Sequence, residues 1–123
     1  MTAPPIFEDT AMEYRQIADS YAVSPQISVE DVATIKAAGF KSVICNRPDN
    51  EDPGQPDHET IRKAVEEAGM AFKWVPVISG QMTADNVADQ AAALEELPGP
   101  VFAYCRSGTR CTNLYAGVQQ LKS

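Results

Sequence analysis

The stretch VFAYCRSGTRCTNLYA, residues 101–116, predicts how the chain folds. Residues 101–104 are apolar and partly aromatic, as expected of a short buried strand. A cysteine and a glycine-centred loop follow, and a helix is expected to begin near Arg110 or Cys111. A strand, a tight loop and a helix in this order direct several backbone N–H groups, and the positive end of the helix dipole, at the residue that ends the strand. We therefore expect an anion-binding loop above Cys105.

The same alternation of helix and strand extends through the chain from residue 28. Each cycle has an N-cap, a helical pattern of apolar residues, a glycine or proline stop and a β-rich run. The expected helices cover residues 28–38, 58–68, 83–97 and 111–122, and the expected strands cover residues 40–46, 71–77 and 101–104, with further candidate strands at 15–17 and 21–24. This alternation predicts an α/β fold with a mainly parallel sheet of four to five strands, flanked by helices and joined by right-handed crossovers.

Length and composition indicate one compact domain. The chain has 123 residues, of which 44% are hydrophobic, so we expect a single domain over residues 1–123 with a loosely ordered N-terminal segment at 1–13. Neither a membrane span nor a signal peptide is visible, so a cytoplasmic location is expected. The net charge of −7 disfavours nucleic acid and membrane surfaces as partners. An anionic ligand would need a locally positive pocket.

The cysteines point to thiol chemistry and away from a metal site. Cys45, Cys105 and Cys111 make an odd number without CxxC spacing, which argues against a disulfide scaffold and a structural zinc site. His58 is the only histidine, so no metal is expected, and no cofactor motif is visible. Cys45, inside an expected strand, has the features of an ordinary buried thiol.

Cys105 has the features of an activated nucleophile. The pKa of a free cysteine is about 8.5, and it falls to roughly 3.5–7.5 at helix N-termini beside cations. Arg106 and Arg110 supply positive charge, and a guanidinium can bind two oxygens of a phosphate, sulfate or thiosulfonate at once. Gly108 allows the positive φ that a concave loop of amides requires. The expected anion-binding loop consists of Arg106, Ser107, Gly108 and Thr109, with Cys105 and Arg110 as the catalytic residues.

These residues carry a family resemblance. CRSGTR resembles the active-site loop of the rhodanese and cysteine-phosphatase superfamily. The segments ISVEDVATIKAAGFKSVICNRPDNEDPGQPD, VPV and PGPVFAYCRSGTR, with their spacing, are similar to the phosphatase-like domain of beta-lactamase hydrolase-like proteins, a bacterial family also described as sulfur transferases. The resemblance covers nearly the whole chain. It implies a dual-specificity-phosphatase-like α/β fold.

Two departures from the phosphatase pattern favour sulfur chemistry. Cysteine phosphatases resemble HC-x5-R, whereas here Arg110 comes one residue early and Tyr104 replaces the histidine. The resulting six-residue loop has the length associated with rhodaneses. A smaller anion-binding loop favours a persulfide on the cysteine over a bulkier phosphoryl group. Phosphatases also use an aspartate on the loop that here reads ISGQMT, which has no acid before Asp85. Positioned acid catalysis contributes about 10²- to 10⁴-fold, and sulfur transfer does not need it.

Three functions follow as hypotheses. The first is a rhodanese-type sulfurtransferase in sulfide metabolism that forms a persulfide on Cys105. The alternative is a tyrosine- or dual-specificity-like phosphatase that forms a phosphocysteine, and the third is a thiol redox sensor using Cys105 and Cys111. The expected ligand is a small anionic sulfur donor or a phosphate-type group. In related proteins the domain is fused to a metallo-β-lactamase-like domain associated with persulfide oxidation, which suggests a persulfide dioxygenase as partner.

Further residues are candidates for accessory roles. Arg47 could contact the anion or form an ion pair with nearby acids. Asp49, Asp52 and Asp57 could replace the missing acid if residues 47–57 fold over the site, or they could simply be solvated. Cys111 could form a reversible disulfide with Cys105, or be a small buried residue at the start of a helix.

Overall fold

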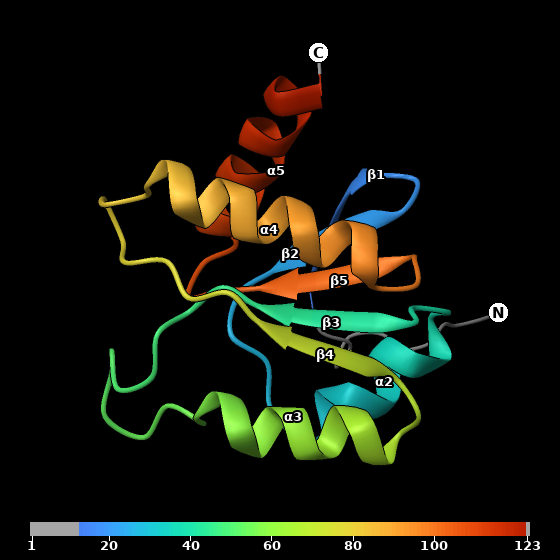
Figure 1. Cartoon of the computed structure of the whole chain (residues 1–123). Helices are drawn as coiled ribbons and strands as arrows, with labels where there is room; N and C mark the ends of the chain where they lie inside the picture. The colour runs from blue at the N-terminus through green and yellow to red at the C-terminus, as the bar shows by residue number, and fades with distance from the viewer. Residues whose placement is uncertain (1–12, 123) are drawn as a thin grey trace, which may run out of the picture.

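The computed structural model describes residues 13–122. The predicted loosely ordered segment at residues 1–13 therefore lies outside the described residues, except for residue 13. A five-stranded sheet with the order β1-β2-β5-β3-β4 forms the centre of the molecule (Figure 1). The strands are β1 (Arg15–Ala18), β2 (Tyr21–Ser24), β3 (Ser42–Cys45), β4 (Ala71–Trp74) and β5 (Val101–Tyr104). Only the β1–β2 pair of this sheet is antiparallel, and the others are parallel. The predicted mainly parallel sheet is confirmed.

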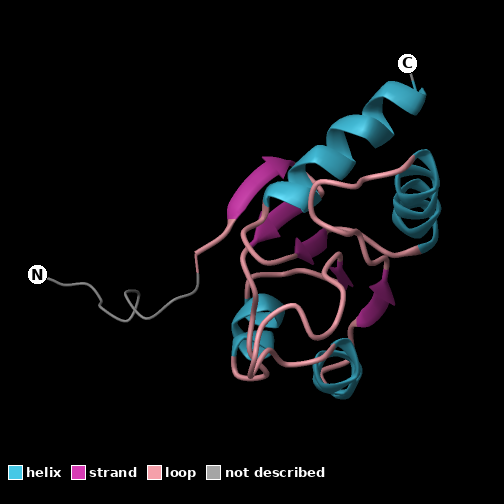
Figure 2. Ribbon diagram, turned by 90° about the vertical axis from the view of Figure 1, so that its left-hand side faces the viewer, coloured by secondary structure: helices cyan, strands magenta, loops and turns pink. Residues whose placement is uncertain are grey.

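Four described helices cover the two faces of the sheet. They are α2 (Asp31–Ala37), α3 (His58–Glu67), α4 (Ala84–Glu96) and α5 (Thr109–Lys122). Helices α2 and α3 lie on one face, and α4 and α5 lie on the other (Figures 1 and 2). Among residues 13–122 no helix is both long enough and apolar enough to cross a bilayer.

Strand β5 shows how the sheet sorts side chains between two hydrophobic clusters. Phe102 and Tyr104 belong to the cluster that includes residues of α2 and α3. Ala103 and Cys105 belong to the cluster that includes residues of α4 and α5. Successive side chains of a strand point to opposite faces, so this alternation places the Cys105 sulfur on the α5 side. Tyr104, at the position of the phosphatase histidine, faces away from that sulfur and lies beside Cys45.

The caps of α3 and α4 lie where the sequence predicts them, whereas the start of α2 and the end of β4 differ from the prediction. Asp57 caps α3 by accepting a bond from the Thr60 N–H at 2.9 Å, and Thr83 caps α4 in a capping box with Asn86. Helix α2 begins only at Asp31, because residues 28–30 form a turn in which Ser28 and Asp31 exchange hydrogen bonds. Strand β4 ends at Trp74, before Pro76, which has no N–H to donate.

The register of the parallel strands brings three loops to one edge of the sheet. Cys45 of β3 pairs with Tyr104 of β5 and with Trp74 of β4, so these strands end together. The loops that follow them cover residues 46–57, 75–83 and 105–108. Ligands of open α/β sheets bind beyond the carboxyl ends of the strands, so this edge is the place for a site.

Candidate active site

Cys105 lies in a buried position at the centre of this edge. The N–H of Gly108 donates a hydrogen bond to the Cys105 sulfur at 3.0 Å. The Cys111 thiol and the backbone N–H groups of Cys111 and Ser107 also act on this sulfur. Led by the Cys111 thiol, these interactions lower the pKa of Cys105 to about 5, against the opposing effect of burial. Cys105 is therefore a thiolate at neutral pH, the reactive form of cysteine.

Gly108 gives the loop a left-handed turn next to the sheet. Its φ is +92°, a conformation that L side chains rarely adopt, whereas an added Cβ would meet the backbone of Ser24 only at an ordinary contact distance of 3.5 Å. Helix α5 begins directly afterwards at Thr109, slightly earlier than the sequence predicts. The loop is thus short enough for its amides to converge on one sulfur atom.

Arg110 is buried beside the thiolate and is held by Glu51. Its Nη1 donates to Glu51 Oε2 at 2.7 Å and to the carbonyl oxygen of Val77 at 2.8 Å, and its Nη2 donates to Glu51 Oε1 at 2.9 Å. The bond with Arg110 is the main cause that lowers the pKa of Glu51, so this carboxylate stays ionised. Sequence reasoning missed Glu51. Its spacing of four residues from Arg47 is the only local signal, because Arg110 is 59 positions away.

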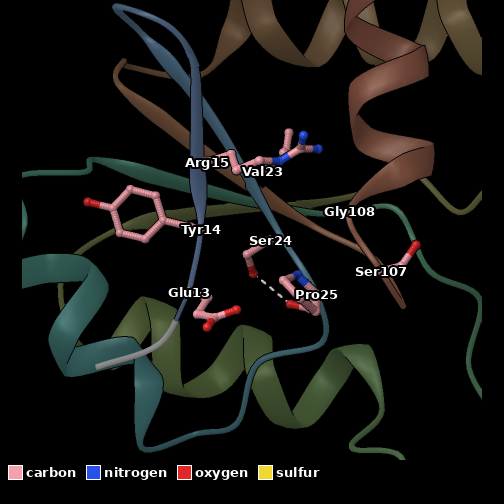
Figure 3. A pocket seen from close by; sticks show the side chains of 8 residues that line it. All are labelled: Glu13, Tyr14, Arg15, Val23, Ser24, Pro25, Ser107 and Gly108. Carbon is pink, nitrogen blue, oxygen red and sulfur yellow. Dashed lines mark hydrogen bonds between the residues drawn. The ribbon is translucent and has the colours of Figure 1, made fainter. Parts of the chain in front are cut away.

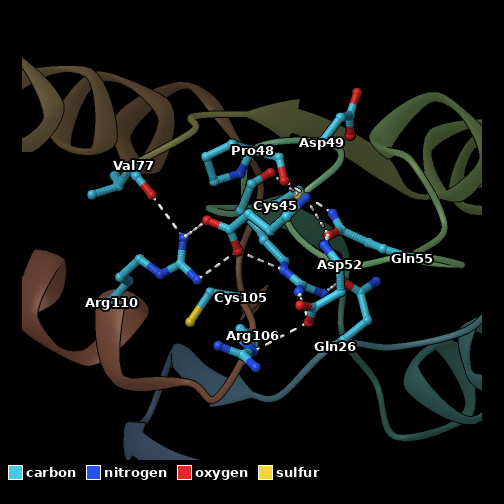
Figure 4. A network of polar contacts seen from close by, with 12 residues as sticks. Gln26, Cys45, Pro48, Asp49, Asp52, Gln55, Val77, Cys105, Arg106 and Arg110 are labelled. Atoms are coloured by element: carbon cyan, nitrogen blue, oxygen red, sulfur yellow. Dashed lines mark hydrogen bonds and ion pairs between the residues drawn. The ribbon is translucent and has the colours of Figure 1, made fainter. Parts of the chain in front are cut away.

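Arg47 forms ion pairs with the acids of its own loop. It is 3% exposed and donates to Glu51 at 2.8 Å, to Asp52 at 2.7 Å and to Gln26 at 2.9 Å. Asp52 also pairs with Arg106 at 3.3 Å, and the Arg106 side chain is 66% exposed. The ion pair that the sequence offers for Arg47 is present, although it is buried and not at the surface; an anion contact of Arg47 stays a prediction. These contacts fold the 47–57 loop over the cysteine loop (Figure 4).

Asp49 and Asp57 support helix α3 and do not reach the cysteine. Both carboxylate oxygens of Asp49 lie 2.8 Å from His58 atoms, one from the backbone nitrogen and one from ring Nδ1. The His58 ring stacks on Trp74 with centroids 3.5 Å apart. In Figure 4 Asp49 points away from Cys105. Since Asp57 is the helix cap, neither residue is placed as a proton donor.

An open cavity of about 640 Å³ lies at the mouth of the cysteine loop. Its lining includes Arg106, Ser107, Thr109 and Arg110 from the loop, together with part of the 77–82 segment. Ser107 and Thr109 are exposed and bond to one another at 3.1 Å. No carboxylic acid is among the described residues that line this cavity. It can admit an anion, and it has no proton donor of the kind that phosphatases use.

A second cavity, of about 480 Å³, adjoins the opposite side of the loop (Figure 3). It is lined by Glu13, Tyr14, Arg15, Val23, Ser24, Pro25, Ser107 and Gly108. Ser107 lines both cavities, so the loop separates them. Arg110 lines only the first, so an anion bound to Arg110 would lie in that cavity.

The three cysteines have different environments. Burial raises the pKa of Cys45 to about 11, so Cys45 stays a neutral thiol, and its Sγ donates to the carbonyl oxygen of Arg47 at 3.4 Å. Burial and the neighbouring Cys105 raise the pKa of Cys111 well above its usual value. All three are free thiols in the structure. Cys111 is thus both a buried residue of the first turn of α5 and a thiol in contact with Cys105.

Comparison with known sequences identifies the family. The family described as beta-lactamase hydrolase-like protein, phosphatase-like domain, matches residues 13–122. A beta-lactamase hydrolase-like protein of Agrobacterium fabrum is 36% identical over 104 residues, and one of Xylella fastidiosa is 33% identical over 105 residues. Each match covers 85% of this chain and 24% of the relative. The chain thus spans about a quarter of the length of these curated relatives.

Solved structures agree with this relationship. A Neisseria meningitidis protein with a provisional phosphatase assignment is 35% identical, with a TM-score of 0.77, over 82% of this chain and 72% of that one. A Shewanella putrefaciens protein of the DUF442 group, with the same provisional assignment, is 22% identical, with a TM-score of 0.77, over 93% and 72%. The latter likeness bears on the fold alone. The resemblance seen in the sequence is confirmed, and the chain belongs to the family of phosphatase-like domains of beta-lactamase hydrolase-like proteins.

Proposed function

We propose that this domain is a cysteine-dependent phosphatase that acts through a phosphocysteine on Cys105. The observation that carries the proposal is the Cys105 sulfur, ionised and held at 3.0 Å from the Gly108 N–H beside the buried Arg110. Donors fixed around a nucleophile can also stabilise the oxyanion that develops next to it. The family and the Neisseria neighbour support this alternative better than the sulfur transfer that the sequence placed first.

The reaction would proceed in two displacements at phosphorus. The Cys105 thiolate forms an S–P bond as the P–O bond to the leaving group breaks, and the leaving group departs with the electron pair. Water then attacks phosphorus, the S–P bond breaks, and its electrons return to Cys105 as inorganic phosphate leaves. Arg110 and the loop amides bind the phosphoryl oxygens in both steps.

The absence of a placed acid restricts the proposed substrates. No carboxylic acid lines the described part of the cavity mouth, and Glu51 is held ionised by Arg110. Without a proton donor, a leaving group must be stable as an anion. We therefore infer that aryl phosphates are better substrates than alkyl phosphates, by about 10²-fold or more, the usual contribution of positioned acid catalysis.

The proposal is tested with p-nitrophenyl phosphate and a rapid acid quench. The parent should release nitrophenolate and show a mass gain of one phosphoryl group on Cys105. Cys105→Ser should lose both signals, whereas Cys45→Ser, a matched change at a buried thiol with a raised pKa, should keep them. Turnover that survives Cys105→Ser, or the absence of any turnover by the folded parent, would refute the phosphatase.

Sulfur transfer is a second candidate, favoured by the six-residue loop from Cys105 to Arg110 and by the missing acid. Here the Cys105 thiolate would attack the outer sulfur of thiosulfate, forming an S–S bond while sulfite leaves with the electron pair. A thiol acceptor would then take the sulfur, and a persulfide dioxygenase is the partner we propose to consume it. A mass gain of one sulfur on Cys105, without turnover of p-nitrophenyl phosphate, would favour this function over the phosphatase.

A further inference from the structure

The guanidinium of Arg110 has one edge that no described residue uses. An arginine carries five N–H donors in a plane. Both N–H groups of Nη1 are used, by Val77 and Glu51, and Glu51 takes one N–H of Nη2. This leaves the Nε–H and the second Nη2–H, which lie side by side on one edge. That pair is the fork with which arginine binds two oxygens of an anion.

The free edge faces the nucleophile. In Figure 4 the Cys105 sulfur lies on the side of the Arg110 guanidinium that is turned away from Val77. The charges of Cys105 and Arg110 also act on one another. An anion bonded to this edge would therefore lie next to the sulfur, where a substrate must be.

Glu51 is itself fixed from two further sides. Its Oε1 accepts from the buried Arg47 at 2.8 Å, and its backbone N–H donates to Gln55 at 3.0 Å. The Glu51 side chain is 21% exposed. A carboxylate bonded to two buried arginines holds one orientation, and it can impose that orientation on Arg110.

We propose that Glu51 is a positioning residue: it grips the outer end of the Arg110 guanidinium and so presents the free edge of Arg110 to the anion above Cys105. The inference shares with the proposed function only the idea that an anion binds at Cys105. A different role for Glu51 would be to lower the positive charge of the site. The two roles make opposite predictions for Glu51→Gln, because the loss of a negative charge alone should strengthen anion binding, whereas the loss of positioning should weaken it.

The test measures binding of inorganic phosphate without requiring turnover. Phosphate should protect Cys105 of the parent from alkylation by iodoacetamide, and the concentration dependence gives its affinity. Glu51→Gln should weaken this affinity by about ten-fold or more, as expected when a charge-assisted contact is lost. Glu59→Gln, the same change at an exposed carboxylate that also pairs with an arginine, should leave the affinity unchanged.

A measurement on the parent avoids dependence on folding of the variant. The Nε–H resonance of Arg110, assigned with Arg110→Lys, should shift on titration with phosphate. The Nε–H of Arg47 already donates a hydrogen bond to Glu51, so its resonance should not shift. Unchanged or tighter phosphate binding in Glu51→Gln, no protection of the parent, or an unshifted Arg110 resonance would each overturn the inference. A failed phosphatase assay would not, because protection and the resonance shift need no turnover.

Discussion

The thiol of Cys111 is the largest single cause of the lowered pKa of Cys105, so removing that thiol should make the nucleophile less acidic. Hydrogen bonds to charged groups contribute about 1.5–3 kcal/mol, and one pKa unit corresponds to about 1.4 kcal/mol. Cys111→Ala should therefore raise the pKa of Cys105 from about 5 by about one to two units. Cys111→Ser keeps a donor at this position and should leave the pKa nearly unchanged.

The pH dependence of alkylation measures this shift directly. Iodoacetamide reacts with the thiolate, so the rate of carbamidomethylation at Cys105, followed by intact mass, should be half-maximal near pH 5 in the parent. Burial of Cys105 can slow the absolute rate at every pH, but the midpoint still reports the pKa. Cys45→Ser is the control, because the pKa of Cys45 is raised to about 11 and its loss should not move the midpoint.

Two results would refute this reasoning. A parent midpoint in the range of an ordinary cysteine, about 8.5, would mean that the loop donors do not stabilise the thiolate. An equal midpoint for Cys111→Ala and Cys111→Ser would mean that the donor at position 111 is not responsible.

Three further predictions concern the loop, the core and the pH dependence of stability. Gly108→Ala and Gly39→Ala both place alanine at a positive φ, so each should lower the free energy of unfolding by about 1–2 kcal/mol. Only Gly108→Ala should slow alkylation of Cys105, and equal alkylation rates in the two variants would contradict this. Gln90→Leu removes hydrogen bonds that Gln90 makes with two buried partners, Asn46 and Tyr21. The free energy of unfolding, measured in urea, should therefore fall by about 1–3 kcal/mol, and an unchanged urea midpoint would contradict this. Folding lowers the pKa of Cys105 from about 8.5, the ordinary value for cysteine, to about 5. The unfolding free energy of the parent, relative to Cys105→Ser, should therefore rise between about pH 5 and pH 8.5 by up to about 1.4 kcal/mol per pH unit, and a flat difference would contradict the lowered pKa.

Much of the fold could be predicted because its signals are local. Asp57 and Thr83 accept hydrogen bonds from N–H groups only three residues away, so the caps of α3 and α4 are legible in short segments. The start of α2 was less predictable, because Ser28 and Asp31 make the reciprocal contacts of a helix start within a preceding turn. The strands at residues 15–17 and 21–24, only candidates in the sequence, are the edge strand β1 and its neighbour β2.

The site could be predicted only where it is continuous in sequence. Cys105, Gly108 and Arg110 lie within six residues, and the geometry of a strand, loop and helix determines how they meet. Glu51 meets Arg110 across 59 positions, through a loop whose path depends on the ion pairs of Arg47. No local pattern encodes such a path.

The choice between sulfur transfer and phosphate hydrolysis depended on features of the phosphatase pattern that the sequence lacks. The short loop and the absent acid favoured sulfur transfer, whereas family membership and the neighbouring structures support a phosphatase-like domain. A shared fold leaves the chemistry of one loop open, because function depends on the site that the fold carries.

The most direct test of the central claim is the mass of the intact protein after parallel exposure to p-nitrophenyl phosphate, thiosulfate and a low-molecular-weight persulfide, each followed by an acid quench. The account predicts a phosphoryl adduct on Cys105 from the aryl phosphate, which is lost in Cys105→Ser and retained in Cys45→Ser. Two results would contradict the claim that Cys105 is the nucleophile of this domain. One is a parent that remains unmodified by all three compounds, and the other is a Cys105→Ser variant that hydrolyses the aryl phosphate as fast as the parent does.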